Sequence, residues 1–483
     1  MLVSLHNLLR KSFSLVSFLM LAAVFASAGE QPACAQANEA AGRNIKARDF
    51  MDAFGVNVHF NDNNYKNVQA IADALNIIGF SRVRGSCSSE ADVAAWKALA
   101  AKTSVYFPAG LKANVLVTGY LNAPSITLAS QEAFIQQMAG LLESIEGPNE
   151  INNYYVGHGT HGPADMSDQT THFARNYAAW AEAIFTWKKS APALAPVKLL
   201  APSIASGDPK DYAALPDVSQ YVEAGNFHFY AGNGRQPSGF GGGNFAAICD
   251  WYKAAATPTR PVAITEWGQT TAGKAGQGGC DEATQAKYFL NQMFDAASRG
   301  VYRAYLYQLM DDTSDGDPTG NGGAESHFGI FDFQWRAKPA AQALANVKNL
   351  LSDKSARFTA KVPAYHVSGI TQAGASGSNL SLSKSDGSTF IVVWNEPQIW
   401  DAKANAPVTP PADPVTVTFG GDYAYRVYDP LIGLNPIAAG HGNKVEVNLL
   451  GSPIMIQILP AARTAAPVRH GIARESARKV KQD

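Results

Sequence analysis

The sequence carries little charge and no excess of either sign. Charged residues make up 16% of the chain, and its 39 Lys and Arg are balanced by 40 Asp and Glu. A chain without a positive field has no general attraction for a polyanion, so we expect no nucleic-acid partner. Hydrophobic residues make up 46% of the 483 positions, which excludes a disordered protein and predicts two or three folded domains.

Long apolar runs are absent beyond the N-terminus. The single long run, from Phe13 to Phe25, follows basic side chains and precedes the small residues Ala26-Ser27-Ala28. It is shorter than the roughly 20 residues of a spanning helix, which argues against the alternative of a membrane anchor. The pattern predicts a signal peptide over residues 1–28, or cleavage at a second site after Ala35. We therefore expect a secreted or periplasmic protein without a membrane span.

Cysteine is also scarce, with four residues in the chain. No CxxC pair and no Cys/His spacing typical of structural zinc occurs. Cys34 lies in or beside the segment expected to be removed, which leaves Cys87, Cys249 and Cys280 in the folded part. Export permits disulfides, and we expect Cys249 to pair with Cys280 while Cys87 stays unpaired.

The middle of the chain alternates β-rich runs with helical patterns. We identify eight β-rich runs, at residues 54–60, 80–84, 114–120, 141–149, 197–203, 225–230, 261–267 and 303–309. Between them apolar residues recur at helical spacing, as from Phe134 to Ile145 and from Phe173 to Trp187. This rhythm predicts an α/β protein with a (β/α)8 TIM barrel over residues 51–353, after a lead-in at residues 29–50. A doubly wound sheet is the alternative, but polar residues at the C-terminal ends of several runs favour the barrel.

The pattern changes after residue 353. From 354 to 461 the chain shows short alternating strands, with Asp386-Gly387 at a hairpin turn, so we expect a C-terminal antiparallel β-sandwich domain. Residues 462–483 are rich in Ala and Arg and lack apolar periodicity, which predicts a disordered tail.

Two glutamates stand at the C-terminal ends of predicted strands. Glu150 follows Gly147-Pro148-Asn149 after the fourth run, and Glu266 lies between Thr265 and Trp267 at the end of the seventh. A closed barrel delivers both strand ends to one rim. Hydrolysis of a glycosidic bond uses such a pair, because one carboxyl protonates the leaving oxygen while the other attacks the anomeric carbon.

Five segments at or near strand ends form a recognisable set. They are GFSRVR (79–84), GPNE (147–150), HFY (228–230), ITEWG (264–268) and FGIFDFQWRAKPAAQAL (328–344). Together they resemble the retaining (β/α)8 glycoside hydrolases of clan A, with families 39 and 5 nearest. The resemblance implies that Glu150 is the acid/base, Glu266 the nucleophile and Asn149 a hydrogen-bond donor to a sugar 2-hydroxyl. It also implies that Arg84 and Tyr230 keep Glu266 ionised, and that no cofactor is required.

Two positions depart from the pattern of that clan. Its acid/base glutamate is often followed by Pro, whereas Ile151-Asn152-Asn153 follows Glu150 here. Its eighth strand commonly supplies a Trp beneath the sugar, whereas Tyr307 and Gln308 stand at that place.

Four further residues are candidate substrate contacts. His228 and Tyr230 alternate along a strand, so one can face the site while the other packs in the wall. Trp267 is either a stacking platform beside Glu266 or part of the core. His59, at the end of the first run, is either a site residue or a satisfied core histidine.

Three other motifs resemble catalytic or metal-binding sites but lack the structural surroundings that such sites need. Asn395-Glu396-Pro397 matches an acid/base motif, yet it lies in the predicted sandwich, so we interpret Glu396 as a surface residue at a strand end. His158 and His161 lack a third ligand at useful spacing, which indicates a mobile loop over the cleft. The run from Asp311 to Asp317 lacks the glutamate of a calcium loop, so we expect a solvated loop and no metal.

The sequence therefore predicts a secreted retaining glycoside hydrolase that cleaves β-glycosidic bonds in a poly- or oligosaccharide by double displacement. Two alternatives stay open. One is a non-catalytic carbohydrate-binding surface protein on a degenerate barrel, against which the joint presence of Glu150 and Glu266 argues. The other is a transglycosylase that remodels exported polysaccharide, which only its products separate from a hydrolase.

Overall fold

Eight parallel strands form a ring in the computed structural model, which describes residues 37–117, 127–154, 169–239, 244–272, 278–312, 323–353 and 362–460. The strands are β3 (Phe54–Asn57), β4 (Arg82–Ser86), β5 (Lys112–Leu116), β6 (Leu142–Glu146), β7 (Lys198–Leu200), β8 (Gly225–Phe229), β9 (Val262–Trp267) and β10 (Ala304–Leu306). They pair in chain order, with β10 returning to β3, and a bridge between Leu200 and Ala224 joins β7 to the residue before β8. The predicted barrel and its eight strands are confirmed. The predicted signal peptide and tail lie outside the described residues.

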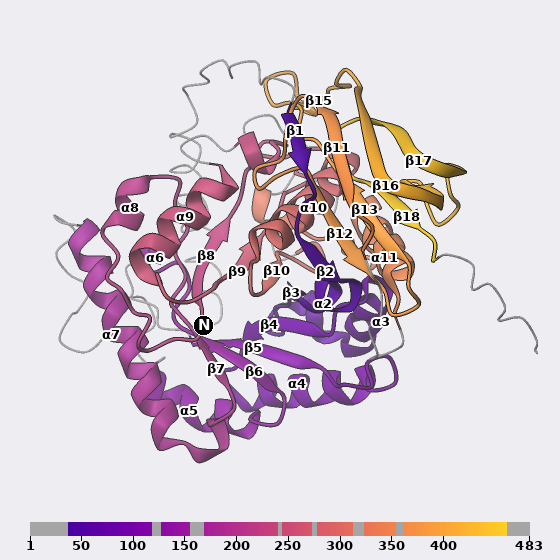
Figure 1. The fold of residues 1–483 in the computed structure, drawn as a ribbon. Helices are drawn as coiled ribbons and strands as arrows, with labels where there is room; N and C mark the ends of the chain where they lie inside the picture. Colours follow the sequence, from indigo (N-terminus) through magenta and orange to yellow (C-terminus); the bar gives the residue numbers. More distant parts are fainter. Residues whose placement is uncertain are drawn as a thin grey trace, which may run out of the picture.

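Helices cover the outside of this ring (Figure 1). The longer ones are α3 (Val68–Ile78), α4 (Glu90–Thr103), α5 (Leu128–Gln137), α7 (Gln169–Ser190), α9 (Phe245–Ala256), α10 (Glu282–Arg299) and α11 (Pro339–Leu351). Shorter ones are α2 (Ala47–Asp52), α6 (Ile151–Tyr154), α8 (Pro209–Ala213) and the 3-10 turns η2 (Asn63–Lys66), η4 (Pro192–Leu194), η5 (Pro237–Gly239) and η6 (Ala324–His327). Because helices cover the outer face and side chains fill the inner one, the strands are buried on both faces, and every residue of β9 is buried.

Local signals set the limits of α10. The side chain of Asp281 accepts a hydrogen bond from the backbone N–H of Thr284 and caps the N-terminus of the helix. Gly300, with φ of 74°, ends the helix in the left-handed conformation that glycine adopts without steric cost.

One predicted helical pattern runs too far. The apolar spacing from Phe134 to Ile145 suggests one helix, but α5 ends at Gln137. Leu142 and Ile145 are buried residues of β6 instead, because a short apolar run satisfies helical and strand spacing equally well. The pattern from Phe173 to Trp187 does lie on one helix, α7, and its apolar residues are buried.

A second sheet follows the barrel. It contains β1 (Ala37–Ala40), β2 (Asn44–Lys46), β11 (Tyr365–Ile370), β12 (Asn379–Ser383), β13 (Thr389–Val393), β16 (Asp413–Tyr428), β17 (Ala438–Leu449) and β18 (Ile454–Ile458). A separate small hairpin joins β14 (Trp400–Asp401) to β15 (Ala406–Pro407). The pairs are antiparallel apart from β2 with β12. The predicted sandwich is confirmed, and strands from the N-terminal lead-in complete it, as Figure 1 shows by the indigo β1 beside the orange β11.

The long strand β16 makes this sheet fold over. Thr416 to Phe419 pair with β11, whereas Tyr425 to Tyr428 pair with β18, and the register with β17 shifts between Thr418 and Tyr423. The two halves of the sheet therefore enclose a core of their own, which includes Val367, Ile391, Val417, Val445 and Ile456. The opposite face, with Leu382, Val392 and Trp394, belongs to the same apolar cluster as the barrel.

The junction between barrel and sandwich buries two carboxyl groups. Asp295 of α10 and Glu396 are 0% and 7% exposed, and burial raises the pKa of both carboxyl groups above their ordinary values. The backbone N–H of Ser238 donates to Glu396 at 2.6 Å, and Trp394 Nε1 donates to Asp295 at 3.2 Å. The interpretation of Glu396 as a surface residue is wrong, because the end of β13 meets the barrel helices rather than solvent.

The predicted disulfide between Cys249 and Cys280 is also wrong. Cys87, Cys249 and Cys280 are all free and buried. Cys249 lies on α9, whereas Cys280 precedes α10 and its thiol contacts the Thr270 carbonyl at 3.7 Å. Burial raises the pKa of each thiol, to about 12 for Cys87, so the three behave as apolar core residues.

No helix among the described segments has the length and apolar character needed to cross a bilayer.

Asp295→Asn should flatten the dependence of stability on pH. Burial and the adjacent Glu396 raise the pKa of Asp295 well above its ordinary value. The stability that its protonated form contributes is complete below the unfolded pKa of about 4 and is lost as pH rises toward the folded pKa. The free energy of unfolding of the native chain, measured by urea titration, should therefore fall as pH rises above about 4, and the variant should show a smaller fall.

The control is Asp49→Asn, because the Asp49 side chain is 55% exposed on α2. In this variant the free energy of unfolding should depend on pH as it does in the native protein. An unchanged dependence of the unfolding free energy on pH in Asp295→Asn would contradict the raised pKa of Asp295 at the junction.

Candidate active site

The predicted site residues meet at the C-terminal ends of the barrel strands. Arg84 comes from β4, Glu150 follows β6, His228 lies on β8 and Glu266 on β9, and Tyr230 follows β8. All of these ends open on one rim, because the strands are parallel.

Glu266 is held by two donors. Arg84 Nη1 donates to its Oε1 at 2.6 Å, and the Tyr230 hydroxyl donates to its Oε2 at 2.6 Å. Burial opposes ionisation, but the charges of His228 and Arg84 and these hydrogen bonds outweigh it and hold the pKa of Glu266 below its ordinary value. Burial and the charge of Glu266 raise the pKa of Tyr230 well above its usual range, which keeps its hydroxyl a donor.

Arg84 is itself fixed between two carboxylates. Its Nε and Nη2 donate to Glu146 Oε1 at 2.8 and 2.5 Å, opposite its contact with Glu266. Burial disfavours the charge of Arg84, yet these two carboxylates raise the pKa of its guanidinium above the ordinary value. Asn114 donates to the second oxygen of Glu146 at 2.7 Å. The sequence reasoning missed Glu146, although a charged residue within a buried strand is itself a signal that it has a partner.

Arg84 also orients Asn149. The guanidinium donates to Asn149 Oδ1 at 2.9 Å, so the amide hydrogens of Asn149 remain available to a substrate hydroxyl. This orientation fits the donor role that the resemblance implies for Asn149.

Glu150 sits on a strained turn. Its φ is 42°, in the left-handed region that non-glycine residues seldom adopt. The Ser203 hydroxyl accepts its backbone N–H at 2.9 Å, and Asn153 Nδ2 donates to its Oε2 at 3.1 Å. The sequence did not indicate either contact, because Ser203 comes from the loop after the neighbouring strand β7 and Asn153 reaches the carboxyl only through the tight turn at Glu150.

His228 bridges the two glutamates. Its Nδ1 lies 2.9 Å from Glu150 Oε1 and 3.4 Å from Glu266 Oε2, and its ring is buried. One oxygen of each glutamate and Nδ1 all lie within 4.8 Å of one another. The two residues predicted to carry the chemistry therefore share one small space.

Aromatic side chains line the rim beside this space. His59, with a side chain 33% exposed, pairs with Asp62 and lies 5.4 Å from the Tyr307 ring. Tyr307 also meets Tyr230 at 6.2 Å and Phe328 at 5.5 Å. His59 therefore belongs to the neighbourhood of the site, and Tyr307 is the half-buried aromatic residue that β10 delivers to it.

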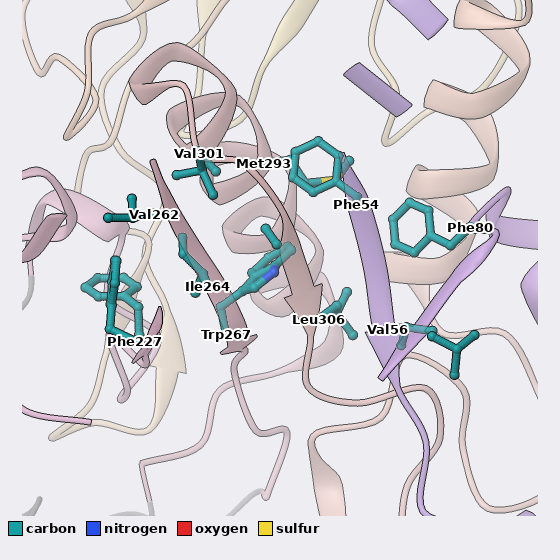
Figure 2. Close-up of a cluster of buried hydrophobic side chains, with 14 of the residues drawn as sticks. Phe54, Val56, Phe80, Phe227, Val262, Ile264, Trp267, Met293, Val301 and Leu306 are labelled. Carbon is teal, nitrogen blue, oxygen red and sulfur yellow. The ribbon is translucent and has the colours of Figure 1, made fainter. Parts of the chain in front are cut away.

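Trp267 does not face the site. It is 1% exposed and packs edge-on against Phe289 of α10, at 5.2 Å between ring centroids. Figure 2 shows Trp267 within an apolar cluster that includes Leu306 and Met293. The stacking role is wrong because successive side chains of a strand point to opposite faces, so Glu266 turns inward and Trp267 outward.

Among the described residues, Glu150, His228 and Glu266 form a cluster with the spacing of metal ligands. However, both oxygens of Glu266 already accept hydrogen bonds, from Arg84 and Tyr230. Such donors stabilise a free carboxylate rather than a metal-bound one, so operation without a metal stays our prediction. His158, His161, Asp315 and Asp317 lie outside the described residues.

Asp311 is buried, whereas the sequence predicts that it lies in a solvated loop. It is 5% exposed, and the buried ammonium of Lys338 donates to it at 2.7 Å. The expectation is wrong for this residue because Lys338, just before α11, neutralises it inside the protein.

Comparison with solved structures finds this fold in a known protein. No protein-family model matches the sequence, and no curated protein matches it. A family 39 glycoside hydrolase from the gut symbiont Bacteroides cellulosilyticus WH2 superposes with a TM-score of 0.55 at 17% identity, over 85% of this chain and 82% of that chain. An endo-laminarinase from Formosa Hel1_33_131 has a TM-score of 0.45 at 14% identity, over 64% of this chain and 90% of that chain.

A GH5_18 protein from Streptomyces cattleya, solved with GlcNAc, has a TM-score of 0.43 at 18% identity, over 66% of this chain and 83% of that chain. The likeness to the family 39 structure shows that this chain has a (β/α)8 barrel fold with an appended β-sandwich, the architecture that the sequence resemblance implied.

Glu146→Gln should destabilise the fold by roughly 3 kcal/mol, because it removes one of the two carboxylates that compensate the buried charge of Arg84. Urea unfolding measures this loss. The matched control is Asp52→Asn, since Asp52 is 52% exposed and Arg82, its partner, keeps Glu143. The control should change stability by less than about 1 kcal/mol, and an equally small change in Glu146→Gln would contradict the role of Glu146.

Proposed function

We propose that the protein is a secreted retaining glycoside hydrolase that cleaves β-glycosidic bonds of a poly- or oligosaccharide. The observation that carries the proposal is the meeting of Glu150 and Glu266 at the mouth of the barrel, with one oxygen of each within 4.8 Å. In retaining enzymes the two carboxyl groups are about 5 to 5.5 Å apart, whereas inverting enzymes need about 6.5 to 9.5 Å to admit a water. The short separation therefore favours double displacement.

The surroundings assign the two roles. Glu266 accepts from Arg84 and Tyr230, which favours the ionised carboxylate that a nucleophile needs. Among the described residues, the carboxyl of Glu150 contacts the His228 ring and the Asn153 amide but no Arg or Lys, and its side chain is 13% exposed. It is the group better suited to hold a proton and to reach a leaving oxygen.

The reaction then runs in two steps. Glu266 attacks the anomeric carbon while Glu150 gives its proton to the departing oxygen, and a glycosyl-enzyme forms. Glu150, now ionised, takes a proton from the water that breaks this intermediate, so Glu266 is released and the configuration is retained. Asn149 contributes by donating to the 2-hydroxyl of the sugar, a contact that strengthens in the transition state.

The aromatic residues at the rim support a carbohydrate as the substrate. Tyr307 and His59 offer a ring surface beside the two glutamates, and a sugar presents apolar C–H faces that suit such rings. A panel of β-linked polysaccharides and aryl glycosides, with product configuration followed by NMR, tests the proposal. Retained configuration supports it, inverted configuration refutes it, and transfer to added acceptors identifies a transglycosylase.

Glu266→Gln should abolish turnover, because no nucleophile remains to form the intermediate. The measurement is kcat on an aryl β-glycoside together with mass spectrometry after a mechanism-based inactivator. We expect no covalent adduct and activity lower by at least about 10⁴-fold. Glu282→Gln, on the outer helix α10, should keep both activity and adduct. Full activity in Glu266→Gln would end the assignment.

Glu150→Gln should separate substrates by their leaving groups. Glycosides with poor leaving groups should react about 10² to 10⁴-fold more slowly, because they need the proton. Activated aryl glycosides should still form the intermediate, and azide, an anion that needs no general base, should accelerate its breakdown and yield a glycosyl azide of retained configuration. Equal loss for all leaving groups would count against the acid role.

A further inference from the structure

A buried chain of hydrogen bonds runs behind His228. Asn226 Nδ2 donates to the Ala201 carbonyl at 3.3 Å, the Thr265 hydroxyl donates to Asn226 Oδ1 at 2.8 Å, and His228 Nε2 lies 3.1 Å from that hydroxyl oxygen. Asn226 and Thr265 are fully buried, and His228 is 2% exposed. The reaction scheme above gives neither Asn226 nor Thr265 a role.

The donor and the acceptor of each hydrogen bond in this series can be assigned. The contact with the Ala201 carbonyl turns the amide nitrogen of Asn226 away from Thr265, so its oxygen faces the hydroxyl. A threonine hydroxyl has one hydrogen, and here Asn226 receives it. Toward His228 the hydroxyl can only accept, which requires a hydrogen on Nε2.

The other ring nitrogen then faces acceptors. A neutral His228 with a hydrogen on Nε2 presents a lone pair at Nδ1, 2.9 Å from Glu150 Oε1 and 3.4 Å from Glu266 Oε2. A lone pair and an ionised carboxylate at 2.9 Å would repel, so a proton must lie between them. Asn153 donates to Glu150 Oε2, which makes Oε1 the oxygen that carries this proton.

We propose that Thr265 and Asn226 are positioning residues that fix the tautomer of His228, so that His228 Nδ1 and Glu150 Oε1 together hold the proton used in the acid step. This inference rests on the proposed function and deepens it. The charged and titratable groups around the pair are Arg84, Glu266 and Tyr230, and Arg84 and Tyr230 donate to Glu266 rather than to Glu150. The single proton of the His228 and Glu150 pair is therefore the one available to a leaving group.

The protons balance over the cycle. In the first step the bond from the anomeric carbon to the leaving oxygen breaks, its bond to Glu266 forms, and the proton of the pair passes to the leaving oxygen. His228 then is neutral and Glu150 ionised. In the second step water replaces Glu266 at the anomeric carbon, and one of its protons returns to the pair.

The first test reads the tautomer directly in the native chain. Nitrogen NMR of ¹⁵N-histidine-labelled protein, with the His228 signals assigned by their absence in His228→Gln, distinguishes the protonation of Nδ1 and Nε2. A neutral ring protonated at Nε2, or a ring protonated at both nitrogens, is the expected result. A neutral ring protonated at Nδ1 would overturn the proposal, whatever the activity of the protein.

The second test uses Thr265→Val and Thr265→Ser. Valine gives Nε2 no acceptor, so a neutral His228 can place its hydrogen on Nδ1 and donate it to an ionised Glu150. The basic limb of the pH profile of kcat/KM should then move down by roughly one pH unit, and poor leaving groups should be affected most. Serine keeps the hydroxyl and should restore the native profile and NMR signals.

The outcomes separate the two proposals. Native pH profiles in both variants would overturn the role of Thr265 while leaving the glycosidase assignment intact. Failure of the glycosidase assignment would instead appear as full activity in Glu266→Gln, and the tautomer measurement does not depend on it. If Thr265→Val does not fold, the native-chain NMR still decides the proposal.

Discussion

The guanidinium of Arg84, clamped between Glu146 and Glu266, is the interaction on which the site depends. A buried cation is costly unless its charge is compensated and its donors are satisfied, and here two carboxylates and the oxygens of Asn57 and Asn149 receive its hydrogens. Glu146 neutralises Arg84 in the barrel interior, so the charge presented to Glu266 comes from a side chain that cannot move away. Glu266, the nucleophile in the proposed reaction, is thereby held in one orientation in the absence of substrate.

The same arrangement separates the behaviour of the two glutamates. Glu266 is surrounded by donors, whereas Glu150 meets Asn153 and the ring of His228. His228 touches both carboxylates, so the protonation of one is coupled to the charge of the other. Two carboxyl groups of equal intrinsic acidity thus have different hydrogen-bond partners, and this difference is the basis of the roles proposed for them.

The sequence predicts those features that depend on local pattern. Strand periodicity places Glu150 and Glu266 at strand ends, and the closed barrel then brings them together. Glu146 and Ser203 were missed because their contacts join segments that only the fold makes adjacent, and Asn153 was missed because its local contact depends on the left-handed turn at Glu150. The stacking role considered for Trp267 was wrong. Neighbouring side chains along a strand point to opposite faces of the sheet, so the sequence alone already indicates that Trp267 and Glu266 do not face the same side. The pairing of Cys249 with Cys280, and the exposure of Glu396, failed because spacing carries no information on which helix face or domain surface a residue meets.

The departure after Glu150 has a physical reason in this chain. The backbone N–H of Ile151 donates to the Ser203 carbonyl at 3.0 Å, and Asn152 exchanges hydrogen bonds with the backbone of Ala205 at 2.8 and 3.1 Å. A Pro at position 151, common in clan A, has no N–H and would lose the first of these bonds. The left-handed turn at Glu150 is therefore maintained by the loop after β7 rather than by a proline ring. Because Asn153 of the same turn also donates to the Glu150 carboxyl, the segment from Ile151 to Asn153 both positions the backbone of Glu150 and orients its side chain.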